Sequence, residues 1–287
     1  MDSDWHVSDL VAQMDVTPDD DGNWNGLVKF SEDRPVVEGS QLLGQAIAAA
    51  MRTTGGRRVV SAHMAFTRVV NATIPAPIML REITNGRTMS SYWVEVAQGG
   101  KVGAAGTMLL DATAPDVMRH SPDMPKVTGP TDSPELEFGV AGREVRIVDA
   151  AYTNDANAPV GTPVIDAWVR LGDVPDDAAI HAGLLAQFTG HMSIAAAMRP
   201  HAGIGQEQAH RTLSTGVNAI HLSLHADVRV DEWLLYHQHA TFAGDGMTHS
   251  DCQVFTEAGA LVASFSVESM VRGFADPSKA GDARTAM

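Results

Sequence analysis

The chain contains one cysteine, Cys252, and no run of about 18 apolar residues of the kind that crosses a bilayer. A single cysteine excludes an internal disulfide and suits a reducing compartment. The first residues, MDSDWHVSDL, are acidic and lack the apolar segment of a signal peptide. We therefore expect a soluble, cytoplasmic protein without a membrane span.

Basic residues are also scarce, since 20 lysines and arginines face 35 aspartates and glutamates and give a net charge of −15. Nucleic acid and anionic membranes need a basic face, so neither is expected as the main partner. A small anionic ligand held by a few local arginines remains compatible with this balance. With 287 residues, 44% of them apolar, the chain has room for two domains of modest size.

The hexapeptide IAAAMR occurs twice, at 47–52 and at 194–199. The first copy lies in a predicted buried helix, GSQLLGQAIAAAMRTTGG, and the second in a predicted helix over 180–203 that Pro200 and Gly203 end. Each helix precedes four strand-like segments separated by hairpin-turn signals. Aligning the halves places His63 opposite His221 and Phe66 opposite Leu224. The sequence therefore predicts one fold built twice.

The expected organisation is an N-terminal unit over residues 1–114 and a C-terminal unit over 135–275. Residues 115–134 contain five prolines among Asp, Ser, Thr and Gly, which favours an extended linker. Residues 276–287 are predicted to be a disordered tail.

Two antiparallel sheets, each wrapped around an apolar helix, can pair their edges into one sheet with both helices on the same side. That α+β arrangement is the double hotdog, and the chain resembles the type II acyl-CoA thioesterase family, which has this fold. The resemblance spans roughly residues 20–273, and its motifs are EGSQLLGQA at 38–46, HMAFTR at 63–68, IHAGLLAQFTG at 180–190, RPHAGIG at 199–205, DEWLLY at 231–236 and GALVASFSVESMVR at 259–272. The first motif is similar to the family's Gly-Gly-Gln-x-x-Gly-Gln-Ala.

The resemblance implies that a water molecule attacks the thioester directly. In the family an Asp on the second helix, a Thr or Ser on the next strand and a Gln on the last strand hold that water. Here the Asp position is Gly190 and the Gln position is Val267. The Thr position is Val217, although a short gap would place Thr215 there instead.

Three interpretations of this loss remain open. His191, with Thr189 and Thr215 nearby in the sequence, is one candidate base, because a histidine can titrate near neutral pH. Glu38 is another, because it precedes Gly39 and Ser40, where backbone amides at a helix start can face a thioester oxygen. The third interpretation is a protein that binds acyl-CoA without cleaving it.

For the coenzyme's phosphates, Arg58 and Arg68 are the candidate contacts, with Arg57 beside them. Pairs of histidines two or four residues apart occur at 221 and 225 and at 237 and 239, but without a cysteine pair or a helical His-Glu-x-x-His we expect no metal. Asp176 and His181 have the Asp-x4-His spacing of hotdog hydratases without the intervening Asn-Pro. No cofactor is expected.

The sequence thus predicts hydrolysis of a fatty acyl-CoA to the free acid and coenzyme A. The alternative is a non-hydrolytic acyl-CoA-binding protein on the same scaffold. Because hotdog sheets commonly extend across a subunit boundary, we also expect a homodimer or a larger homo-oligomer.

Overall fold

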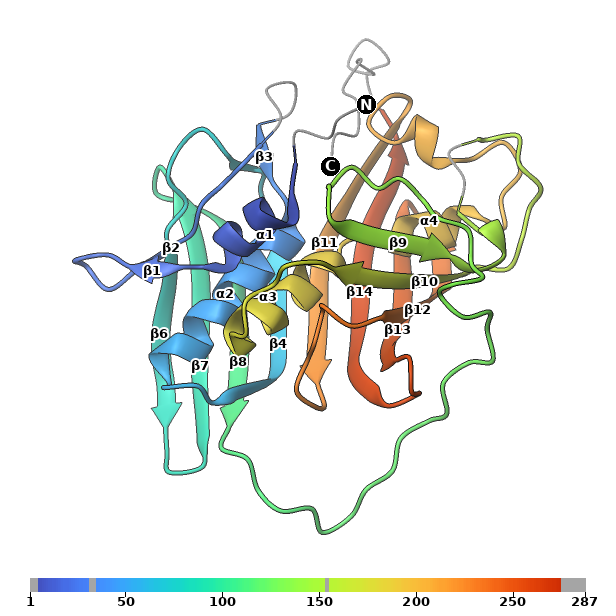
Figure 1. Ribbon diagram of the computed structural model, residues 1–287. Helices are drawn as coiled ribbons and strands as arrows, with labels where there is room; N and C mark the ends of the chain where they lie inside the picture. Colours follow the sequence, from blue (N-terminus) through green and yellow to red (C-terminus); the bar gives the residue numbers. More distant parts are fainter. Residues whose placement is uncertain (1–4, 31–34, 153–154, 275–287) are drawn as a thin grey trace.

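One twelve-stranded antiparallel sheet forms most of the protein (Figure 1). The computed structural model describes residues 5–30, 35–152 and 155–274, so the predicted tail at 276–287 lies outside the described residues. The strands of the sheet in chain order are β1 (Thr17–Pro18), β2 (Trp24–Asn25), β4 (Arg58–Phe66), β6 (Ile78–Asn85), β7 (Met89–Gln98), β8 (Lys101–Asp111), β9 (Arg143–Ile147), β10 (Val164–Leu171), β11 (Leu213–Leu224), β12 (Leu234–Gly244), β13 (Met247–Thr256) and β14 (Leu261–Gly273). A separate pair is formed by β3 (Val36–Val37) and β5 (Val70–Asn71).

The strand order is symmetric about its centre and confirms the predicted repeat. It runs β1-β2-β6-β7-β8-β4-β11-β14-β13-β12-β10-β9, so each strand of one half has a counterpart at the same distance from the β4–β11 seam. At the seam His63 pairs with His221, Ala62 with Leu222, and Met64 with Ile220. A pseudo-two-fold axis therefore passes between the two histidines that the sequence alignment had placed opposite each other. The fold is the double hotdog.

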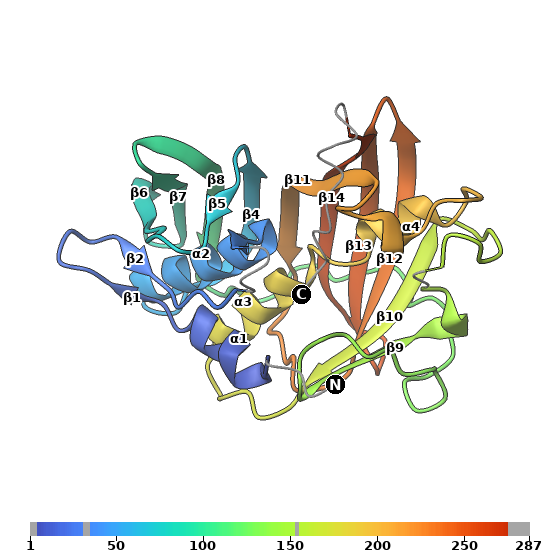
Figure 2. The same cartoon turned by 90° about the horizontal axis from the view of Figure 1, so that it is seen from above.

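The helices are α1 (Val7–Met14), α2 (Gly39–Thr53), α3 (Ala178–Phe188) and α4 (Ser193–Met198), with short 3-10 turns η1 (Val148–Ala150) and η2 (Gln206–Gln208). Figure 2 shows α2 and α3 side by side within the curve of the sheet. They run antiparallel and touch at two glycines: a Cβ on Gly44 would lie 2.4 Å from the Gly183 carbonyl oxygen. Glycine is needed there because two backbones meet. Twelve of the fifteen residues of α2 are buried, as its apolar and small side chains predict.

The predicted continuous helix over 180–203 is wrong. The chain leaves helical geometry after α3, Met192 takes a left-handed conformation (φ 69°), and α4 begins at Ser193. The two IAAAMR copies are consequently not equivalent, because the first lies inside α2 whereas the second spans α4 and Arg199. The Gly44–Gly183 contact instead relates α2 to α3 with an offset of 139 residues. The repeat is real, but the hexapeptide does not mark it.

Sequence analysis missed α1, β9 and β10, and these elements bear on where the units begin. α1 belongs to the N-terminal unit by sequence, yet the Val7 amide donates to the Ala141 carbonyl at 2.9 Å. The segment predicted to be a linker contains no helix or strand, and the Trp168 indole donates to the Thr128 carbonyl at 2.8 Å. The boundaries at 114 and 135 stay predictions. Within the described ranges, no helix is both long and apolar enough to cross a membrane.

Candidate active site

The start of α2 meets the end of α3 on one side of the helix pair. A Cβ on Gly39 would lie 2.7 Å from the Phe66 ring, and a Cβ on Gly190 would lie 2.4 Å from the Ser40 hydroxyl oxygen. The predicted residues Glu38, Gly39, Ser40, Thr189 and His191 thus gather around Gly190, and we call this place the helix junction. It draws on both halves of the chain.

Ser40 fills the space beside the position where the resemblance led us to expect a carboxylate. The family pattern has Gly at position 40 and Asp at position 190, whereas this chain has Ser and Gly. Because 2.4 Å is far inside van der Waals contact, a side chain at 190 and the Ser40 side chain exclude each other. This chain therefore lacks the Asp at position 190 but carries a hydroxyl group at position 40 of α2, where the family pattern has Gly. Ser40 is buried, with 2% of its surface exposed.

Arg143 on β9 is a buried cation beside this junction. It is 8% exposed, its guanidinium donates to the Phe138 carbonyl, and its carbon centre lies 4.9 Å from the Phe138 ring centroid. Burial lowers the pKa of Arg143 to about 10, and the Glu38 carboxylate partly offsets this effect. Arg143 therefore stays charged at pH 7, and its Nε has no hydrogen-bond partner in the described part of the chain.

His191 is buried against aromatic rings at the same place. Burial, together with the positive charge of Arg143, lowers the pKa of His191 to about 3, so the imidazole is neutral at pH 7. Its Nε2 lies 3.3 Å from the Gln187 amide nitrogen. Because an amide nitrogen only donates, Nε2 accepts and the ring proton sits on Nδ1. His191 is thus a poor base and a competent hydrogen-bond donor.

The two threonines have other neighbours. The Thr189 hydroxyl donates to the Ala186 carbonyl at 2.6 Å and helps to end α3. Thr215, on β11, is 8% exposed and lies 3.5 Å from the His210 Nε2. A catalytic role for either residue stays a prediction.

The other vacated family positions are filled by apolar side chains. Val267 is fully buried and Val217 packs against the core. Polar residues lie next to them instead, since Ser250 is the direct cross-strand neighbour of Val267. Among the described residues, several buried side chains in this region have a polar atom without a partner, and they are Ser193, Gln238, Thr248, Ser250 and Ser269.

The two candidate phosphate contacts lie at opposite ends of the helix pair. Arg68 is exposed and follows Phe66, which packs against Gly39 at the helix junction. Arg58 lies at the other end of β4, where its guanidinium donates to the His225 carbonyl at 2.9 Å. The structure brings Arg68, and not Arg58, to the end of β4 that adjoins the junction.

Sequence analysis missed Arg143 and Gln187. In β9 the residues Arg143, Val145 and Ile147 alternate with half-buried positions and are all buried. Because side chains two residues apart in a strand point to the same face, the spacing places Arg143 on the same face as the apolar Val145 and Ile147. An arginine on the apolar face of a strand is the sequence signal that would have identified it. No such signal marks Gln187, which occurs in a helix that is apolar on all sides. Within the described residues, no cluster of three or more His, Cys, Asp or Glu side chains has metal-binding geometry.

Both halves of this double hotdog match sequence models of thioesterase domains. The sequence model of the acyl-CoA thioesterase N-terminal domain matches residues 31–111, and that of the C-terminal domain matches residues 115–271. The chain belongs to the acyl-CoA thioesterase family.

Similar proteins support this assignment over nearly the full length. Acyl-coenzyme A thioesterase 8 of Mus musculus is 23% identical over 295 residues, covering 92% of this chain and 88% of the mouse protein. The acyl-CoA thioesterase II TesB2 of Mycobacterium marinum superposes with a TM-score of 0.77 at 25% identity, covering 93% of this chain and 99% of that one. The tesB protein of Mycobacterium avium subsp. paratuberculosis gives 0.74 at 20% identity, covering 92% and 98%.

Proposed function

We propose that the chain hydrolyses fatty acyl-CoA thioesters to the free acid and coenzyme A, and that the reaction takes place at the helix junction. Membership of the acyl-CoA thioesterase family supports the reaction. The observation that supports the place is the contact between Ser40 and Gly190, which puts a polar group of α2 where the family carries its carboxylate.

Glu38 is the better of the two candidate bases. It is the N-cap of α2, and its carboxylate acts electrostatically on the buried Arg143, whereas the pKa of His191 is lowered to about 3. A carboxylate can act as a general base and take a proton from water. In this scheme Glu38 removes the proton while the water oxygen attacks the thioester carbon.

The charge that develops on the carbonyl oxygen then needs hydrogen-bond donors. The first amides of α2 have no acceptor within the helix, and the Glu38 side chain does not cap them. The neutral His191 offers its Nδ1 proton, and Ser40 offers a hydroxyl. The tetrahedral intermediate collapses by expelling the coenzyme thiolate, which takes up the proton that Glu38 received.

The proposal also covers the contact with the coenzyme phosphates, the cellular location and the oligomeric state. Arg68 contacts a coenzyme phosphate at the rim, since arginine pairs well with phosphate and this one is exposed near the junction. The protein is cytoplasmic and forms a homodimer or larger homo-oligomer.

A thiol-release assay over acyl-CoA chain lengths tests the function. Glu38→Gln keeps the shape of the side chain and should lower kcat at least 100-fold, because a general base contributes roughly 10²–10⁴. Glu257→Gln, in the exposed turn between β13 and β14, is the matched control and should retain wild-type activity. Saturable acyl-CoA binding with no thiol released at any chain length would refute hydrolysis and favour the non-hydrolytic alternative.

A further inference from the structure

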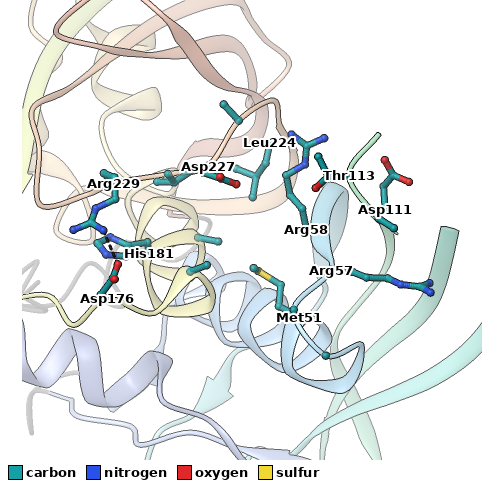
Figure 3. Close-up of a pocket in the computed structure, with 17 residues that line it drawn as sticks. Met51, Arg57, Arg58, Asp111, Thr113, Asp176, His181, Leu224, Asp227 and Arg229 are labelled. Carbon is teal, nitrogen blue, oxygen red and sulfur yellow. Dashed lines mark hydrogen bonds and ion pairs between the residues drawn. The ribbon is translucent and has the colours of Figure 1, made fainter. Parts of the chain in front are cut away.

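Pockets outside the helix junction differ in the ligands that they suit. One of about 520 Å³ is lined by three arginines and three aspartates (Figure 3), so its charges favour neither sign of ligand. Another, of about 450 Å³, has no lysine or arginine among the described residues that line it, and its carboxylate is Asp251. Most of its other polar side chains are imidazoles and hydroxyls, namely His221, His237, His239, Ser223, Ser264 and Ser266. This lining suits a cation, and we call the place the outer-face pocket.

His237 and His239 lie side by side on the outer face of β12. The hydroxyl of the preceding Tyr236 donates to the Leu185 carbonyl of α3 at 3.4 Å, so the Tyr236 side chain faces the helices. Because side chains alternate along a strand, His237 and His239 both point to the opposite face, where they line the outer-face pocket. Both are accessible, since His239 is exposed and the His237 side chain is 24% exposed.

Asp166 on β10 determines how the His237 ring can be used. It is the direct cross-strand neighbour of His237, and its Oδ1 lies 2.7 Å from the His237 Nδ1. A carboxylate accepts hydrogen bonds, so Nδ1 carries the ring proton and Nε2 keeps its lone pair. A carboxylate behind an imidazole is the usual support of a metal ligand, because it holds the ring in place and makes the other nitrogen more basic.

The spacing of the two histidines matches what one metal ion requires. Residues i and i+2 of a strand have Cα atoms about 7 Å apart on one face. A tetrahedral ion with metal–nitrogen distances of about 2.0–2.1 Å needs its two nitrogens roughly 3.3 Å apart, which two imidazoles reach by leaning toward each other. Asp251 is the cross-strand neighbour of His239, but its Oδ1 already lies 3.3 Å from the His249 Nε2. Its charge therefore favours a cation without making it a ligand.

We propose that His237 and His239 bind one divalent ion of the zinc class through their Nε2 atoms, with Asp166 orienting His237 and water completing the coordination. Imidazole nitrogen suits such ions, whereas Mg²⁺ and Ca²⁺ prefer oxygen. The expectation of no metal rested on the sequence around the histidines, but the supporting carboxylate is 71 residues away along the chain. The site is on the opposite face of the sheet from the helix junction and is independent of the proposed function.

Calorimetric titration of the full-length protein with Zn²⁺ at pH 7.5 tests this inference. The wild type should bind Zn²⁺ saturably and should not bind Mg²⁺ in the same way. Asp166→Asn leaves both ligands in place and should weaken Zn²⁺ binding about 10- to 100-fold, as expected for a group that orients a ligand. His237→Asn and His239→Asn each remove a ligand and should weaken it at least as much. His249→Asn, on the same face of the sheet, is the matched control and should bind Zn²⁺ like the wild type.

The outcomes are distinct from those of the proposed function. All four variants should release thiol at the wild-type rate, since their residues lie on the other face of the sheet from the helix junction. Zn²⁺ binding that is absent, that survives His239→Asn, or that is lost in His249→Asn overturns the inference whatever the thiol assay shows. Binding that His239→Asn and Asp166→Asn both weaken supports the metal site even if no thiol is released.

Discussion

The contact between Ser40 and Gly190 makes a testable prediction about both stability and activity. A Cβ at position 190 would lie 2.4 Å from the Ser40 hydroxyl oxygen and 2.8 Å from its Cβ, whereas ordinary contacts are 3.4–4 Å. Gly190→Ala should therefore lower the free energy of unfolding by about 1–3 kcal/mol, the usual cost of overpacking. Gly190 does not have a positive φ, so the backbone adds no strain.

In a Ser40→Gly background the same substitution meets open space, and its cost should largely disappear. The double-mutant cycle Ser40→Gly, Gly190→Ala should thus show a coupling free energy of about 1–3 kcal/mol. Urea denaturation of the four proteins measures it. Gly216→Ala, at a glycine with nothing within 4 Å of its Cβ, is the control that should not couple to Ser40→Gly.

The same contact makes a prediction about activity when aspartate is placed at position 190. Ser40→Gly, Gly190→Asp rebuilds the family pattern at these two positions, so it should release thiol faster than Gly190→Asp alone. Equal destabilisation by Gly190→Ala in the wild-type and Ser40→Gly backgrounds would show that the two side chains do not compete. In that case the reasoning about the helix junction fails.

Three further predictions concern stability. Asp177→Ala removes an N-cap that accepts the Ala179 amide at 2.8 Å, and it should cost about 1 kcal/mol in thermal or urea unfolding; no loss would mean that the cap contributes nothing. Gly44→Ala should cost about 1–3 kcal/mol or more because its methyl group meets the Gly183 backbone, whereas Gly129→Ala should be nearly neutral. Although burial alone would lower the pKa of His249, hydrogen bonds to Glu268 and Asp251 raise it. Its protonated form therefore stabilises the fold below the unfolded value of about 6.5, and this contribution is lost as the pH rises through the folded pKa. Glu268→Gln should flatten the stability profile above about pH 6.5, and an unchanged slope would contradict the pairing.

The sheet was predictable because its signals are local and repeated. Alternating apolar residues and Gly-containing turns define β6–β8 and β12–β14, and the axis passes between His63 and His221 as the alignment implied. The helices were less predictable. The apolar, alanine-rich segments on both sides of residues 189–193 favour one continuous helix, and a non-glycine residue such as Met192 gives no local signal for the left-handed conformation that separates α3 from α4.

The candidate site was only partly accessible from the sequence. Glu38, Ser40 and His191 were found because motif positions and helix starts are local features. Arg143 approaches them from β9, and only the folded chain shows that it electrostatically couples Glu38 and His191.

The small β4–β11 seam determines how the two halves of the chain should assemble when they are no longer covalently joined. β4 and β11 share only four paired positions, and residues 112–134 between the halves carry no strand. A cut in that segment should leave the two pieces assembled, because the α2–α3 contact and the seam both survive it. Expressed separately, each piece would expose an unpaired strand edge and an apolar helix face. Because the two halves are related by a pseudo-two-fold axis, we expect each piece to cover these surfaces by pairing with a second copy of itself.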